Sequence, residues 1–286
     1  MTVEQWLQTW IALRAPELKP RTLDSYRDLI HRYIAPSIGP ADLETLPPIS
    51  ISALLASVMA DGHSRTAELI YVLLRASFKE LRPDLMARVP RPKHKQTSPE
   101  AWSDAHIAAY LAAISGHRQQ LALTLAITLG MRRGEICGLR WQDIDFERRL
   151  IHICNQRVRL DSGHIIDCSP KSETSDRWLP IPDQLLPLLK SRRQLTGYVC
   201  SISPSGLDSA HRRLLQKLNL PYIPLHGLRH SMATACIRNG GQMASLQHIL
   251  GHANYATTAN RYTHPDFGML QSALDCAGRA WYTVLR

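Results

Sequence analysis

Helical spacing of apolar residues runs through most of the chain, and one interruption restricts the fold strongly. The interruption lies between about residues 150 and 179. It contains short runs rich in β-branched or aromatic residues: Ile151-His152-Ile153, Val158-Arg159-Leu160, Ile165-Ile166 and Trp178-Leu179. Turn-forming segments separate these runs, as is typical of short strands. We therefore expect a mainly α protein with a small antiparallel sheet of about three strands.

Residues 1–82 are predicted to form a small all-helical domain. The first helix follows Thr2, which can cap it, and carries apolar residues at helical spacing as far as Leu13. Further helices are expected from near Pro20 to before Gly39, from about Ser50 to Ala60, and from Ser64 to Leu81. The tryptophans and tyrosines of this domain are expected to pack in its core.

Residues 83–99 combine four prolines with a run of positive charge. Prolines prevent a continued helix, and the charge makes burial costly. One interpretation is a solvated linker between two domains. The other is a linker that lies along a polyanionic partner, with Lys93 and Lys95 as its contacts.

Residues 100–286 are predicted to form a second, mostly helical domain around the small sheet. A helix is expected after Ser103 and ends near Ile114, and the nearly all-apolar segment from Leu121 to Leu129 suits a central buried helix. Helices are expected to resume near Asp183, Ser205, His226, Gln242 and Pro265.

The composition favours a polyanionic partner and gives no sign of export. Lysine and arginine total 34 against 24 acidic residues, a formal net charge of +10, although such a charge often reflects only a soluble surface. No segment reaches about eighteen uninterrupted apolar residues, and the N-terminus has no basic region before an apolar core, so no membrane partner is expected. The six cysteines form no Cys-x-x-Cys pair. They are typical of reduced thiols, and we expect a cytoplasmic, nucleoid-associated protein.

Several separated motifs of the second domain supply a set of chemically active side chains. Arg132 follows Gly130-Met131, and His226 and Arg229 stand in His226-Gly227-Leu228-Arg229-His230. His252 ends Leu250-Gly251-His252, and Tyr262 lies in Arg261-Tyr262-Thr263-His264. Arginine pairs bidentately with phosphate oxygens, histidine moves protons near neutral pH, and a tyrosine hydroxyl can form a covalent intermediate. This inventory suits a site that binds and attacks a phosphodiester.

The order of these motifs resembles the catalytic domain of the tyrosine recombinases, the phage integrase family. The resemblance extends to Pro170-Lys171-Ser172, and Lys19-Pro20-Arg21-Thr22 is similar to the start of the family's SAM-like core-binding domain. It implies that Tyr262 attacks a DNA phosphate and forms a 3′-phosphotyrosyl bond. Arg132 and Arg229 would stabilise the transition state, His226 and His252 would assist, and Lys171 would protonate the leaving 5′ oxygen.

The resemblance also implies partners and supporting residues. No cofactor and no metal are expected, because two guanidiniums occupy the role of a cation. The partners would be a double-stranded DNA recombination site and DNA-bending or directionality factors. The protein would form a homo-tetramer on DNA and would be mostly monomeric when free. Glu135, one helical turn after Arg132, is expected to fix that arginine or its neighbour. Arg21, Lys93 and Lys95 are the candidate DNA contacts.

Two alternatives within the site follow from spacing. His226 and His230 are four residues apart and could bind zinc, but the metallohydrolase pattern requires Glu where Gly227 stands. His230 is expected instead to be packed or capping.

His252 and Tyr262 are ten residues apart, one more than the family pattern, so the insertion must be absorbed between Asn254 and Asn260. Tyr255 is the other nearby tyrosine, but it lacks the Arg-Tyr-Thr-His setting.

Two alternative functions and one C-terminal element complete the expectations. A type IB topoisomerase-like enzyme would use similar residues to swivel one duplex, and a non-cleaving DNA-binding regulator would have lost the chemistry.

After Tyr262, apolar residues from Phe267 to Trp281 recur at helical spacing. Such an apolar stripe must pack against another surface. We expect it to dock onto a neighbouring subunit; the alternative is that it packs against its own domain.

Overall fold

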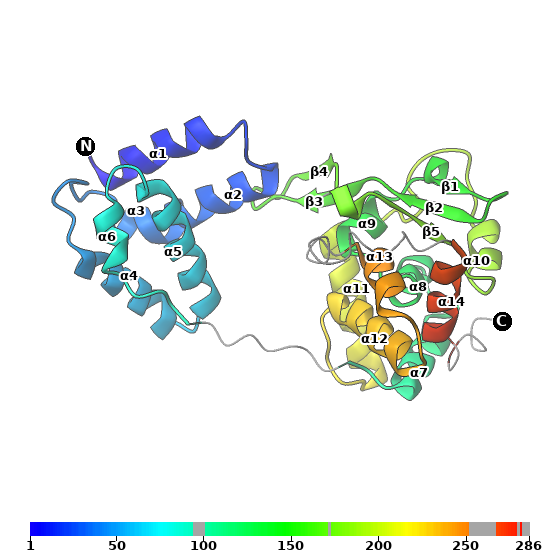
Figure 1. The fold of residues 1–286 in the computed structure, drawn as a ribbon. Coiled ribbons are helices and arrows are strands. Elements are labelled where there is room, and N and C mark those ends of the chain that lie inside the picture. The colour runs from blue at the N-terminus through cyan, green and yellow to red at the C-terminus, as the bar shows by residue number, and fades with distance from the viewer. Residues whose placement is uncertain (94–100, 171–172, 252–266, 279–280, 282–286) are drawn as a thin grey trace. The chain divides into compact units, whose positions relative to one another are not determined.

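Two separate hydrophobic cores organise the chain. The computed structural model describes residues 1–93, 101–170, 173–251, 267–278 and 281. One unit comprises residues 1–97 together with 160–164, and the other comprises 98–159 and 165–286. Each unit has its own cluster of buried apolar side chains, and helices predominate in both (Figure 1). The predicted mainly α fold is confirmed.

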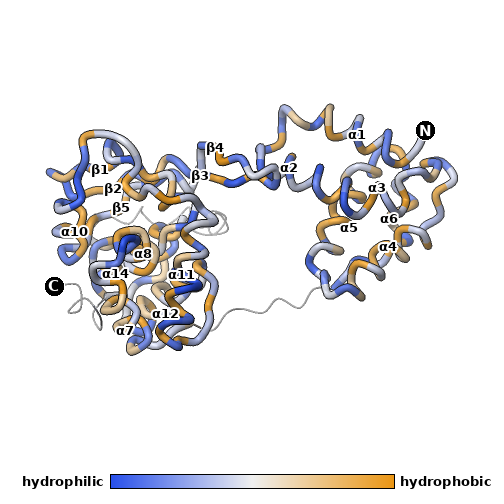
Figure 2. The backbone as a smooth tube through the Cα atoms, turned by 180° about the vertical axis from the view of Figure 1, so that it is seen from behind, coloured by the Kyte–Doolittle hydropathy of each residue, from blue (hydrophilic) through white to orange (hydrophobic). Residues whose placement is uncertain are grey.

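The N-terminal unit is built from helices whose apolar faces meet in its core. Its α-helices are α1 (Val3–Arg14), α2 (Pro20–Leu29), α3 (Ala35–Ile38), α4 (Pro48–Ala60), α5 (Ser64–Phe78) and α6 (Pro83–Ala87). Thr2 caps α1 as predicted, because its hydroxyl accepts a hydrogen bond from the Gln5 amide at 3.2 Å. A π-helical turn over Ile30–Ile34 joins α2 to α3, a detail that apolar spacing did not indicate. Hydrophobic and hydrophilic stretches alternate along these helices (Figure 2).

The prediction that the linker begins at residue 83 is wrong in its first part. Residues 83–87 form α6, and Leu85, Met86 and Val89 are buried in the N-terminal core. Pro83 starts this helix because the first helical position needs no amide hydrogen. Pro83 therefore opens a helix of the N-terminal unit instead of beginning a linker.

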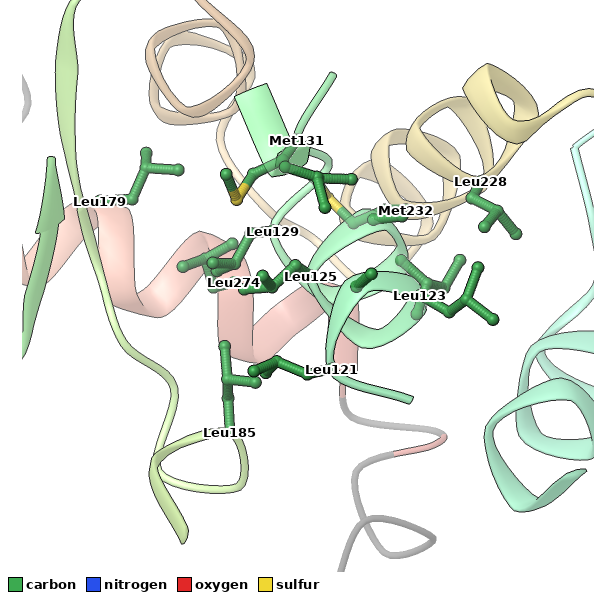
Figure 3. Close-up of a cluster of buried hydrophobic side chains, with 14 of the residues drawn as sticks. Leu121, Leu123, Leu125, Leu129, Met131, Leu179, Leu185, Leu228, Met232 and Leu274 are labelled. Atoms are coloured by element: carbon green, nitrogen blue, oxygen red, sulfur yellow. The ribbon is translucent and has the colours of Figure 1, made fainter. Parts of the chain in front are cut away.

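The second unit surrounds helix α8 (Gln120–Thr128), in which every residue after Gln120 is buried. This confirms the predicted central helix. Figure 3 shows Leu121, Leu123 and Leu125 of α8 among side chains from other elements of the core. The remaining helices are α7 (Asp104–Ile114), α9 (Arg133–Gly138), α10 (Leu186–Ser191), α11 (Pro204–Leu218), α12 (Leu225–Arg238), α13 (Met243–Leu250) and α14 (Phe267–Gly278).

The strands form two sheets where one was predicted. Strands β1 (Ile144–Asp145), β2 (Leu150–Ile153) and β5 (Arg177–Pro180) make an antiparallel sheet in the order β1-β2-β5. Strands β3 (Gln156–Arg159) and β4 (Ile165–Cys168) pair separately as an antiparallel hairpin. The hairpin residues are half-buried or exposed, whereas Ile151, Ile153 and Leu179 of the first sheet are buried. The β-type segments of the sequence predicted the strands but not their division into two sheets.

Helix α14 corrects the expected docking of the C-terminal stripe. It packs against α8, α12, α13 and β5 of its own domain, and α12 and α14 can be followed side by side in Figure 1. Leu270, Leu274 and Trp281 are at most 1 % exposed. The stripe is therefore covered within the domain, which was the alternative interpretation. Phe267 and Met269 remain exposed.

Two further observations bear on the sequence expectations. Among the described residues, no helix is long and apolar enough to cross a membrane. All six cysteines are free thiols; four are buried, and Cys154 and Cys168 are half-buried.

Candidate active site

Arg132 lies where the sequence predicted, at the start of helix α9 directly after the bend at Gly130. Its side chain is 33 % exposed. The Glu135 carboxylate accepts hydrogen bonds from the Arg132 backbone amide at 2.8 Å and from Nη1 at 2.7 Å. Glu135 thus contacts Arg132 at the spacing of one helical turn that the sequence indicated. The Nη2 atom of Arg132 donates to the Gly251 carbonyl oxygen at 2.8 Å.

Glu135 also forms a buried ion pair with Arg177, the first residue of β5. Their side chains are 3 % and 1 % exposed, and Arg177 donates to both carboxylate oxygens at 3.1 Å. Burial alone would raise the pKa of Glu135, but the charge and hydrogen bonds of Arg177, followed by Arg132, lower it below its ordinary value. Glu135 is therefore an anion between two cations at neutral pH.

Arg229 and His226 lie one turn apart on α12, as their spacing predicted. Arg229 is buried and donates through Nη1 to the Gly130 carbonyl oxygen at 2.8 Å and through Nη2 to the Leu250 carbonyl oxygen. Burial, and then the charge of Arg132, lower the pKa of Arg229 to about 9, which leaves it protonated at neutral pH. Loss of hydration, followed by the charges of Arg229 and Arg132, lowers the pKa of His226. His226 is thus neutral at physiological pH.

The carboxyl end of α13 is the point where the arginines converge. The carbonyl oxygens of Ile249, Leu250 and Gly251 accept hydrogen bonds from Arg177, Arg229 and Arg132, respectively. The last carbonyls of a helix have no partner within it, so side-chain donors satisfy them here. The next residue along the chain is His252.

Two glycines make this convergence possible. Gly130 and Gly251 both have φ of 60°, a conformation that residues with a Cβ atom adopt with strain. A Cβ atom at Gly130 would also collide with Met232, and one at Gly251 would lie 2.9 Å from the Thr174 carbonyl oxygen. The backbone conformation therefore favours glycine at both positions, and the neighbouring Thr174 backbone adds a steric reason at Gly251.

An open cleft of about 470 Å³ borders this cluster. Arg132 and His226 line it, and other cationic side chains, Arg133, Arg157 and Arg212, contribute to its walls. Arg229 is buried behind these residues. The cleft thus presents a guanidinium, a neutral imidazole and additional positive charge to any ligand that enters it.

Several predicted site residues lie outside the described residues. These are Lys95, Lys171, His252, Tyr262 and the rival Tyr255. Lys93 is exposed, and Arg21 is exposed on α2, 3.6 Å from Asp24. His230 is exposed on α12, so the expectation that it is packed is wrong. Among the described residues, no group of three potential ligands is arranged to hold a metal ion.

Arg177 is the functional residue that the sequence reasoning missed. The available signal was the period of two in β5, which places Arg177 on the same face as the buried Leu179. An arginine on the inner face of a strand requires a buried anion, and Glu135 supplies it.

The chain is similar to known proteins of one family. Residues 104–269 match the family model described as "Phage integrase family", and residues 2–59 match "Phage integrase, N-terminal SAM-like domain". The tyrosine recombinase XerC-like protein of Caldanaerobacter subterraneus is 31% identical over 60% of this chain, and the match spans 52% of that protein. Tyrosine recombinase XerC of Alcanivorax borkumensis is 28% identical over 96% of this chain and 93% of its own length.

Solved structures show the same fold. The Tn1549 transposon integrase in complex with transposon right end DNA has a TM-score of 0.76 at 21% identity, over 96% of this chain and 99% of that one. The lambda integrase tetramer bound to a Holliday junction has a TM-score of 0.65 at 21% identity, over 88% and 77%. Both family models, in chain order, account for most of the sequence. The chain therefore belongs to the phage integrase family of tyrosine recombinases.

Proposed function

We propose that this chain is a site-specific DNA recombinase that exchanges strands between two double-stranded DNA sites through a 3′-phosphotyrosyl intermediate. The observation that carries the proposal is the convergence of Arg132 and Arg229 on the carboxyl end of α13, with His226 one helical turn from Arg229 on α12 and lining the same cleft as Arg132. A phosphodiester in the adjoining cleft would meet the Arg132 guanidinium and the neutral His226 imidazole, which line the cleft, while Arg229 adds its charge from a buried position.

The chemistry follows from the charges of these groups. Attack on a phosphate places extra negative charge on its non-bridging oxygens, and preorganised guanidiniums stabilise that charge without reorganisation. The neutral His226 can accept a proton, as activation of a phenol requires. We assign Tyr262 as the nucleophile, Lys171 as the acid for the leaving 5′ oxygen, and His252 as a hydrogen-bond donor to the phosphate. The hydroxyl of the partner strand reverses the reaction, so the bond energy is conserved.

The same proposal extends to partners. The solved relatives named above are bound to DNA, one of them as a tetramer on a Holliday junction. We propose a tetramer of this chain on paired sites and a mostly monomeric free protein, with Lys93, Lys95 and Arg21 as DNA contacts. DNA-bending or directionality factors would act on the assembled complex.

Strand exchange is distinguished from strand swivelling by two plasmids. The site is first selected from a random-sequence duplex library by binding to the Tyr262→Phe variant, which lacks only the attacking oxygen. A supercoiled plasmid with two selected sites should recombine with the wild-type protein and remain unchanged with Tyr262→Phe. Rapid relaxation of a plasmid without any site would favour a topoisomerase, and binding without cleavage would favour a regulator.

A further inference from the structure

Arg177 occupies the centre of the site without a part in the proposed chemistry. Its side chain is 1 % exposed. Its three guanidinium nitrogens donate hydrogen bonds to groups on three segments of the chain: Glu135 of α9, the carbonyl oxygen of Ser175, and the carbonyl oxygen of Ile249 in α13. An arginine can do this because its planar fork holds its donors in fixed directions.

Toward α9, Arg177 fixes the carboxylate that holds Arg132. It donates to each oxygen of Glu135 at 3.1 Å, and the same two oxygens accept from Arg132 at 2.7 Å and 2.8 Å. The carboxylate is thus bound on both sides and cannot turn about its own axis. The direction of the Arg132 guanidinium therefore depends on Arg177 through one shared anion.

Toward α13, Arg177 fixes the helix end that leads to His252. Its Nε atom donates to the Ile249 carbonyl oxygen at 2.6 Å. The next two carbonyl oxygens, of Leu250 and Gly251, are held by Arg229 and Arg132. Arg177 thus anchors the first of three consecutive carbonyl groups, and the two phosphate-binding arginines of the proposal anchor the others.

The geometry points to Arg177 as a positioning residue for the cleavage step, which orients Arg132 through Glu135 and holds the carboxyl end of α13 through Ile249. This inference rests on the proposed function. Lysine cannot replace it, because one ammonium nitrogen cannot reach the carboxylate and both carbonyl oxygens from a single place. The competing role is purely structural, in which Arg177 only holds β5 within the domain.

Single-turnover cleavage separates positioning from structural support. The substrate is a nicked duplex carrying the selected half-site, in excess over the full-length protein. A structural defect lowers the amplitude of cleavage, because fewer protein molecules are folded. A positioning defect instead lowers the rate constant of cleavage by the folded molecules. Misplacement of a reacting group by about 1 Å costs roughly 100-fold in rate. We expect Arg177→Lys to lose about that factor in rate constant, with half-site affinity and amplitude preserved.

Leu179→Ala is the matched control. Leu179 is fully buried, two residues along β5 on the same face, and is not among the hydrogen-bond partners of Glu135 or the α13 carbonyls. Its truncation weakens the same strand by opening a cavity. At a temperature where both variants are folded, Leu179→Ala should cleave with the wild-type rate constant. An equal loss of rate constant in Leu179→Ala, at a matched melting temperature, would assign Arg177 to structural support.

A double variant keeps the test decisive if Arg177→Lys does not fold. Removing both partners of a buried ion pair is tolerated better than removing one, so Glu135→Gln with Arg177→Met is compared with Glu135→Gln alone. We expect the double variant to cleave no faster than Glu135→Gln. A wild-type rate constant of cleavage in Arg177→Lys or in the double variant would overturn this inference and leave the proposed function intact. An absence of any wild-type adduct would instead remove the proposed function, and this inference with it.

Discussion

Arg229 and Arg132 differ in how far their guanidinium groups are exposed to the cleft. Arg229 is buried, with both terminal nitrogens donating to backbone carbonyl oxygens, whereas Arg132 is one-third exposed and lines the cleft. Buried charges cost solvation energy unless they are fully hydrogen-bonded. The site therefore holds one guanidinium in a buried position and one at the surface of the cleft.

The protonation state of His226 follows from these neighbours. Loss of hydration, and then the positive charges of Arg229 and Arg132, disfavour the imidazolium form and lower the pKa of His226. We expect NMR titration of the His226 ring to give a pKa below the ordinary value of about 6.5. Arg132→Ala should raise it, because one repelling charge is removed. A pKa at or above the ordinary value, unmoved by that substitution, would contradict the proposed electrostatics.

Glu135→Gln is expected to destabilise the protein in a pH-dependent way. The substitution leaves Arg177 buried without its anion, which typically costs about 3–5 kcal/mol. The folded pKa of Glu135 is lowered, so its ionic contribution is present above the unfolded pKa of about 4.3 and is lost as pH falls through the folded pKa. Urea unfolding from pH 7 to pH 3 should show the wild type and the variant converging toward acid. A constant difference over this range would exclude the linkage.

At the scale of elements, helix α14 is part of the catalytic core. Leu274 is fully buried on α14, while Phe267 at its start is 48 % exposed. Leu274→Ala should destabilise the domain by about 2–5 kcal/mol, because it opens a cavity. Phe267→Ala should change stability by no more than about 0.5 kcal/mol. Chemical denaturation of the full chain measures both, and similar effects of the two substitutions would show that α14 is not packed as described.

The helices were largely predictable from sequence because most of them have one buried face. Apolar spacing gave α1, α7 and the central α8, and a capping residue fixed the start of α1 and α7. The division of the strands into two sheets was not predictable, because short runs specify strands but not partners. Helix α6 was missed since proline was taken as a helix breaker, although it also favours the first helical position.

The site was predictable to the extent that its residues belong to local motifs. Arg132, Glu135 and His226–Arg229 lie as their spacing predicted, each within one turn of a helix. The convergence of three arginines on the α13 carbonyls joins segments that are far apart in sequence. Backbone acceptors leave no signature in side-chain identity, so this part of the site could come only from the folded structure.

At the scale of the whole molecule, the linker is expected to contribute affinity without sequence preference. Lysine contacts neutralise phosphates but do not read bases. Replacing Lys93 and Lys95 with alanine should weaken binding to the selected site and to random duplex about equally. It should also reduce the slope of log affinity against log salt by about two units. A slope equal to that of the wild type would show that these residues face solvent in the complex.

The central claim, that Tyr262 attacks a phosphate held by Arg132 and Arg229, has one direct test. The wild-type protein is incubated with a nicked duplex of the selected site, digested with protease, and the DNA-linked peptide is sequenced by mass spectrometry. We expect the DNA 3′ phosphate to be attached to Tyr262, a free 5′ hydroxyl on the released strand, and no adduct in Tyr262→Phe. An adduct that persists in Tyr262→Phe and disappears in Tyr255→Phe would contradict the assignment.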